Sequence, residues 1–147
     1  MFKSVLGIVL ILAIYMLIKN NTYPELGIVD NKLRELDNKP HGVSSQTDQK
    51  EKKVDALEYR DSLEESKKII LSILKEDDAD IIVDTDNYIR AVYKTKLMRY
   101  KDDVEFYFDG NLVQYRSESR VGYSDAGLNL KRYKDIKRRY QGSDGLE

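Results

Sequence analysis

The chain has 147 residues, a formal net charge of −1 and no cysteine. This length suits one domain with a hydrophobic core rather than two. The lack of cysteine excludes disulfides, thiolate metal sites, cysteine nucleophiles and attachment of a lipid through cysteine. Nucleic-acid binding is not expected, because it usually requires a basic domain and here 26 acids balance 25 bases.

Residues 1–19 form the first predicted element, a transmembrane helix. The stretch from Ser4 to Ile18 contains neither a charge nor a proline. Its fifteen residues reach about 22 Å as a helix, against a hydrocarbon core of roughly 30 Å, and Lys3 and Lys19 can extend the span to the two interfaces. A cleaved signal peptide and a buried helix are the alternatives, but no Ala-x-Ala-like cleavage site follows.

The charges beside this helix favour export of the rest of the chain, because the free amine and Lys3 precede the apolar stretch. The predicted location is therefore the cell envelope, as a single-pass membrane protein whose domain lies on the extracytoplasmic (periplasmic) side. Residues 20–42 are predicted to be a tether, since they hold both prolines, with a possible short helix over 30–36.

Residues 43–141 are predicted to form a single α+β domain, followed by a disordered tail over 142–147. Ser62 and Glu65 have the spacing of a capping box and open an amphipathic helix over 62–76. The period then changes to two, and Asp109-Gly110 is a strong hairpin signal. The predicted strands cover 80–83, 88–96, 104–108 and 112–118, with a possible edge strand within 54–59 and a closing helix over 127–140.

Strands joined by consecutive hairpins form an antiparallel meander, one face of which must be covered. The predicted fold is therefore an α+β domain with an antiparallel four- to five-stranded meander sheet, covered on one face by two helices. The N-terminal transmembrane helix precedes it.

Three stretches resemble the motifs of one family. Residues 39–46 read KPHGVSSQ, residues 100–106 read YKDDVEF and residues 116–132 read RSESRVGYSDAGLNLKR. Together they resemble the bacterial and plastid proteins known as the domain of unknown function 1499 family, over residues 38–141. His41 stands where that family usually has Asn. The resemblance implies a membrane-associated protein and brings no established activity.

The segment from Arg116 to Arg132 is the best candidate for a binding site, at the junction of the last strand and the last helix. A helix N-terminus offers unpaired N–H groups and partial positive charge, and arginines bind phosphates or carboxylates bidentately. The predicted ligand-binding residues are Arg116, Ser119, Arg120, Ser124, Asp125 and Arg132, supported by Ser44, Ser45, Asp102, Asp103 and Glu105. A structural interpretation stays open, in which Ser124 or Asp125 caps the helix and the arginines pair with the acids across the sheet.

No catalytic residue, metal ligand or cofactor is predicted. A Ser–His pair of His41 with Ser44 or Ser45 is not expected to act as a nucleophile, because His41 lies at the end of the predicted tether. The predicted function is a non-enzymatic binding module of the envelope, with the membrane and an anionic ligand or envelope protein as partners. Two alternatives remain, a hydrolase that uses the carboxylates of the sheet and a structural subunit of a membrane complex. The oligomeric state is not predicted.

Overall fold

The computed structural model combines helices with antiparallel strands and describes residues 2–142 and, among these, the side chains from residue 5 onward. Of the predicted tail over 142–147, all but Gly142 lies outside the described residues. The elements in chain order are α1 (Phe2–Asn21), β1 (Ile28–Val29), β2 (Lys32–Leu33), β3 (Gly42–Ser44), the 3₁₀-helix η1 (Lys50–Lys52), β4 (Leu57–Glu58), α2 (Leu63–Glu76), β5 (Asp80–Thr85), β6 (Tyr88–Lys94), β7 (Lys101–Asp109), β8 (Leu112–Ser119) and α3 (Leu128–Tyr140).

The main sheet has six strands in the order β3-β8-β7-β6-β5, and β4 also pairs with β8. The α+β class and the antiparallel sheet are therefore confirmed. Strands β5 to β8 run as consecutive hairpins, and β4 lies within the predicted edge segment. The expected four to five strands are too few, because β3 pairs with β8 through Gly42↔Glu118 and Ser44↔Arg116. A strand of three residues is too short to show alternation, which is why sequence periodicity does not reveal it.

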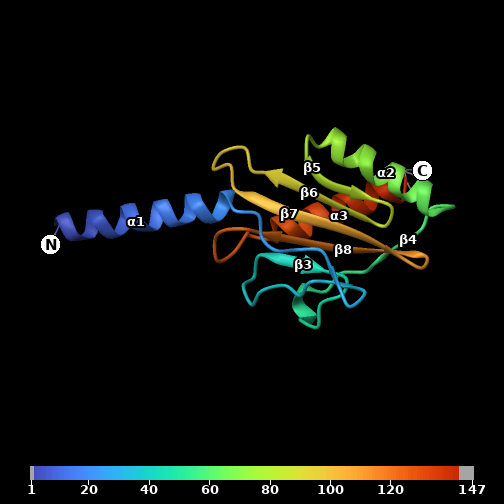
Figure 1. Ribbon diagram of the computed structural model, residues 1–147, viewed down its shortest axis with the longest axis horizontal. Helices are drawn as coiled ribbons and strands as arrows, with labels where there is room; N and C mark the ends of the chain where they lie inside the picture. Colours follow the sequence, from blue (N-terminus) through green and yellow to red (C-terminus); the bar gives the residue numbers. More distant parts are fainter. Residues whose placement is uncertain (1, 143–147) are drawn as a thin grey trace.

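The two faces of this sheet are covered by different parts of the chain (Figure 1). On the inner face, α2 and α3 pack over the strands, and residues such as Ile70, Phe106 and Ile136 form the hydrophobic core. On the outer face lies the segment between α1 and β3, where Leu33 packs against Tyr88 and Tyr107. Helices thus cover one face of the sheet, and the segment between α1 and β3 covers the other.

The N-cap residues of α2 and α3 determine where these two helices begin. The Ser62 hydroxyl accepts a hydrogen bond from the Glu65 amide at 3.1 Å, so α2 has the expected N-cap. At α3 the N-cap is Gly127, whose φ of 79° lies in the left-handed region. Each helix then directs its apolar residues toward the sheet.

Residues 20–42, predicted as a tether with a short helix over 30–36, contain the small hairpin β1–β2 instead of that helix. Its turn residues Asp30 and Asn31 have φ values of 51° and 60°. Asp and Asn tolerate the left-handed conformation better than other residues with a side chain, and two such residues in succession favour a tight hairpin over a helix.

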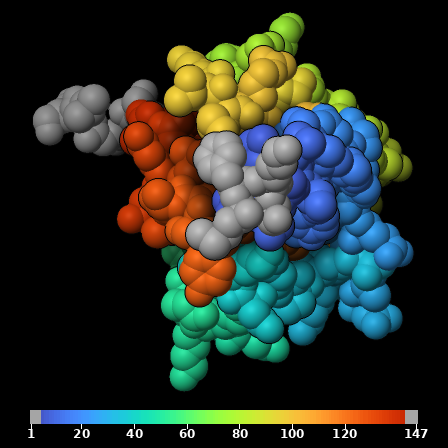
Figure 2. All heavy atoms as spheres, turned by 90° about the vertical axis from the view of Figure 1, so that its left-hand side faces the viewer, coloured from blue at the N-terminus to red at the C-terminus, as the bar shows by residue number. Residues whose placement is uncertain are grey.

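The first helix projects away from the sheet, as Figure 1 shows from the side and Figure 2 along its direction. Among the described residues, no helix combines the length and apolar character needed to cross a membrane. This finding overturns the predicted transmembrane anchor over 1–19, together with the single-pass membrane location and the periplasmic placement. The physical reason is length, because the apolar run from Val5 to Ile18 extends only about 21 Å at 1.5 Å per residue, short of roughly 30 Å.

Tyr115 lies at the centre of the core on β8. Its ring packs against Phe106 with centroids 5.3 Å apart and against Tyr133 at 5.2 Å. Its hydroxyl is buried and has no hydrogen-bond partner among the described residues. The ring therefore contributes packing, whereas the buried oxygen is a cost.

Replacing Tyr115 with Phe is expected to leave the free energy of unfolding unchanged or raise it by about 1 kcal/mol at neutral pH, because only the unpaired hydroxyl is removed. Burial raises the pKa of Tyr115 from 10.0 to about 12. Between these values the unfolded chain loses the Tyr115 proton while the folded chain keeps it, so wild-type stability falls as pH rises and the variant is spared this loss. Urea denaturation at neutral and at alkaline pH measures both effects, and a clear loss of stability at neutral pH would contradict the first.

Candidate functional site

The outer face of the sheet carries a group of six charged side chains, five of them buried, here called the outer-face network. Alternation along β6, β7 and β8 directs them all to the side away from α2 and α3. Three are basic and three acidic, so their formal charges cancel. The members are Arg90, Asp103, Glu105, Arg116, Glu118 and Arg120.

Asp103 is the centre of one half of the outer-face network. Its Oδ1 accepts hydrogen bonds from Arg90 Nη2 at 2.7 Å and from Arg120 Nη2 at 3.0 Å, and its Oδ2 accepts from Arg120 Nε at 2.6 Å. The carboxylate is 1% exposed. Because two guanidinium groups share one buried carboxylate, this half carries an excess of positive charge.

Glu105 and Arg116 form the other half. Glu105 is completely buried and accepts hydrogen bonds from the Tyr88 hydroxyl at 2.7 Å and from Arg116 Nη1 at 3.1 Å. Arg116 also binds Glu118 through Nη2 and donates from Nε to the Arg34 carbonyl at 2.9 Å. Burial and the neighbouring Glu105 carboxylate raise the pKa of Tyr88 far above its usual value, so Tyr88 acts only as a neutral donor here.

The last turn of α1 and the segment after it are held over this network by polar contacts. The side-chain oxygen of Asn20 accepts a hydrogen bond from the Lys101 amide at 2.8 Å, and its backbone carbonyl accepts one from Arg120 Nη1 at 3.2 Å. The Gly27 amide donates to Glu105 at 2.9 Å. The Tyr23 ring lies over the Arg120 guanidinium at 4.6 Å, a distance that favours cation–π attraction. The segment predicted as a tether is therefore bound to the sheet.

A small cleft remains where this segment crosses the end of β8. Its volume is about 120 Å³, or about four water molecules at roughly 30 Å³ each. Three cations and three carboxylates take part in its lining. The lining residues are Lys19, Pro24, Leu26, Asp37, Asp103, Arg116, Glu118, Ser119 and Arg120.

A second polar cluster lies on the inner face, beneath the start of α3. Arg132 Nη2 binds Asp102 Oδ2 at 2.7 Å, and the Ser119 hydroxyl donates to Asp102 Oδ1 at 2.6 Å. Asn129 is fully buried and its amide donates to the His41 carbonyl at 3.1 Å and to Ser119 Oγ at 3.0 Å. This cluster joins α3 to β3, β7 and β8.

The N-terminus of α3 is occupied by the chain's own carboxylate. Asp125 accepts hydrogen bonds from the Gly127 amide at 2.9 Å and from the Asn129 amide at 2.8 Å. Ser124 contributes a bond from the Ala126 amide to its hydroxyl at 3.2 Å. The Gly127 and Asn129 N–H groups at this helix start are thus already used.

The predicted binding residues therefore do not form one site. Arg116 and Arg120 lie on the outer face and, with Ser119, take part in lining the cleft. Arg132 lies on the inner face with Asp102, whereas Asp125 accepts from the Asn129 amide of α3 and Ser124 from the Ala126 amide before that helix. Among the supporting residues, Ser45 accepts the Tyr115 amide at 2.8 Å and Ser44 accepts the Gln46 amide at 3.2 Å. Asp103 and Glu105 lie on the outer face and Asp102 lies on the inner face, so the three carboxylates do not lie together.

A family model for a protein of unknown function (DUF1499) matches residues 32–139, which is more than half of the chain. The chain belongs to the DUF1499 family. No curated protein and no solved structure matches it. Arg116, Arg120 and the inner cluster lie within the DUF1499 match, whereas the cleft residues Lys19, Pro24 and Leu26 precede it.

Several residues of the DUF1499 site are absent from the sequence prediction. Arg90 could have been found from the alternation along β6, which places it opposite Glu105. Glu118 lies inside the predicted segment from Arg116 to Arg132, and alternation along β8 could have placed it on the same face as Arg116. No local sequence pattern points to Asp37 or Tyr23, because both belong to irregular segments that only long-range contacts place beside the sheet.

Proposed function

We propose that this domain is a non-enzymatic binding module that takes up a small anion in the cleft between the outer face and the segment after α1. The observation that supports it is the meeting of Lys19, Arg116 and Arg120 around one cleft. Lys19 has no ion-pair partner among the residues that the structure describes. A cation without an internal partner is the group most available to an external anion.

The two arginines keep some capacity to donate. Arg120 uses Nε and both terminal nitrogens for Asp103 and the Asn20 carbonyl. Arg116 uses the same three nitrogens for Arg34, Glu105 and Glu118. A guanidinium has five N–H groups, so each arginine has N–H groups beyond those three bonds.

The acids in the lining restrict which anion fits. Asp37, Asp103 and Glu118 would repel a ligand that offers only acceptor oxygens. An anion that also carries a hydroxyl can direct its donor to these carboxylates and its charged oxygens to the cations. Monohydrogen phosphate and small hydroxycarboxylates have this combination and a size compatible with about 120 Å³.

Lys19→Ala is the sharpest test, because removing this side chain breaks no ion pair within the described chain. Calorimetric titration of the full chain with inorganic phosphate is expected to show binding that weakens by about three- to tenfold in the variant, equivalent to about 0.6–1.4 kcal/mol. Lys96→Ala, which removes an exposed lysine that does not line the cleft, serves as the matched control and should bind like the wild type. Absence of phosphate binding to the wild type, or equal loss in both variants, would contradict the proposal.

A further inference from the structure

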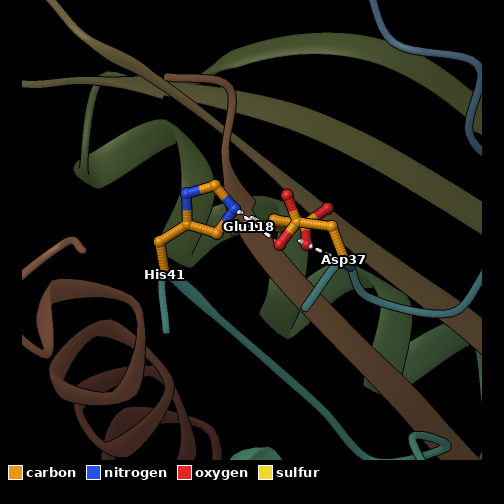
Figure 3. A group of neighbouring side chains, drawn as sticks. All are labelled: Asp37, His41 and Glu118. Atoms are coloured by element: carbon orange, nitrogen blue, oxygen red, sulfur yellow. Dashed lines mark hydrogen bonds and ion pairs between the residues drawn. The ribbon is translucent and has the colours of Figure 1, made fainter. Parts of the chain in front are cut away.

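Asp37, His41 and Glu118 bring three side chains with metal-binding chemistry together at the edge of the cleft (Figure 3). His41 immediately precedes β3, Glu118 lies near the end of β8, and Asp37 belongs to the segment that crosses the outer face. One ligand atom from each residue lies within 4.8 Å of the other two. The proposed anion cleft uses neither the imidazole of His41 nor a metal.

The backbone fixes two of these three residues. Gly42 pairs with Glu118 across the β3–β8 ladder, and the Ser119 amide donates to the His41 carbonyl at 3.0 Å. A Cβ atom on Gly42 would lie 2.9 Å from the Ser117 carbonyl oxygen, which is too close for any larger residue. The absence of a side chain at Gly42 therefore lets β3 approach β8 closely enough to bring His41 to Glu118.

The imidazole is directed at both carboxylates. His41 Nε2 lies 3.0 Å from Asp37 Oδ1 and 3.9 Å from Glu118 Oε1. A tetrahedral ion with ligands at 2.0–2.1 Å separates them by about 3.3–3.4 Å. The two measured distances bracket this value, and no two of the three ligand atoms are more than 4.8 Å apart.

Burial and charge are also suited to a cation. The side chain of His41 is 1% exposed and that of Glu118 is 16% exposed, whereas Asp37 is 44% exposed and leaves a path from solvent. Glu118 binds Arg116 through Oε2, so its Oε1 is the oxygen that faces His41.

We propose that Asp37, His41 and Glu118 bind one divalent transition-metal ion of the zinc class. One imidazole nitrogen and two carboxylate oxygens are ligands that Zn²⁺ accepts, and three protein ligands leave a fourth position open. The ion takes the lone pair of Nε2, which requires the proton on Nδ1. That nitrogen is buried without a partner in the described part of the chain, and because a missing partner of this kind weakens metal binding by about 10–100-fold, we expect micromolar rather than nanomolar affinity.

Asp37→Asn tests the site with little risk to folding, since Asp37 is half-exposed and Asn keeps an oxygen for the Lys39 amide. The full chain, stripped with a chelator and held in phosphate-free buffer, is titrated with Zn²⁺ by calorimetry and followed by thermal unfolding. We expect one ion per chain in the wild type with a rise in Tm, and at least about tenfold weaker binding in the variant. Asp48→Asn, the same change at an exposed residue nearby, should behave like the wild type.

Two results would overturn this proposal. One is a wild type that shows neither heat of binding nor a rise in Tm with Zn²⁺, and the other is an Asp37→Asn variant that binds Zn²⁺ as the wild type does. A His41→Gln variant that folds should lose binding as well. Because these titrations contain no phosphate and the Lys19→Ala comparison contains no metal, failure of the metal site and failure of the anion cleft can be told apart.

Discussion

Replacing Asp103 with Asn is expected to lower the free energy of unfolding by about 3–5 kcal/mol. The carboxylate is 1% exposed and accepts hydrogen bonds from both Arg90 and Arg120. Without the negative charge, the two buried guanidinium groups repel each other, and the amide NH2 that replaces one carboxylate oxygen cannot accept their hydrogen bonds. Urea denaturation followed by circular dichroism measures the loss.

The comparison that isolates burial is Glu25→Gln, which breaks the exposed pair with Arg34 at 3.1 Å. That change is expected to cost no more than about 0.5–1 kcal/mol, because water solvates both partners. Replacing Arg90, Asp103 and Arg120 together by apolar residues should cost less than removing Asp103 alone, since no uncompensated charge remains. Equal costs for Asp103→Asn and Glu25→Gln would refute the role given to the outer-face network.

Asn129→Ala is expected to destabilise the fold by about 2–4 kcal/mol, because several buried groups lose their partner at once. The Asn129 amide binds the His41 carbonyl, Ser119 and Asp125, and its oxygen accepts from Ser117 and Arg132. Asn129 therefore links β8, the residue before β3 and the segment that caps α3.

Thermal or urea unfolding of Asn129→Ala beside Asn38→Ala gives the matched measurement, since Asn38 is exposed and its loss should change stability by less than about 0.5 kcal/mol. Asn129→Asp tests the polarity of the site. A carboxylate there would face Asp125 at 2.8 Å without the N–H groups that now separate them, so we expect a loss at least as large as for Ala. Tolerance of Asp would show that the hydrogen bonds of Asn129 are not needed.

Elements with a local signature could be predicted from the sequence. Ser62 marks the start of α2, and the alternation of Val104, Phe106 and Phe108 marks β7 and its buried face. The β7–β8 hairpin was expected at Asp109-Gly110, and its register Asp109↔Leu112 places Gly110 in the turn with φ of 62°. In each case, residues within a few positions determine the outcome.

The candidate site depends on contacts that no local pattern reveals. Pairing of the arginines with carboxylates across the sheet was open as a structural interpretation, and the structure contains such pairs at Arg116, Arg120 and Arg132. The division of these arginines between two faces was not foreseen, because it depends on the register of β8 and on the position of α3. The approach of Asp37 and His41 to Glu118 depends on β3, which is too short to show alternation.

The junction after α1 has a mechanical consequence. Asn20 is bound to the Arg99 carbonyl and the Lys101 amide, and its own carbonyl accepts from Arg120. These contacts restrict rotation of α1 relative to the sheet, so the direction of the projecting helix is fixed by its contact with the start of β7. A torque applied to the far end of α1 would be transmitted through Asn20 to Arg120, and so to the shape of the cleft that Arg120 lines.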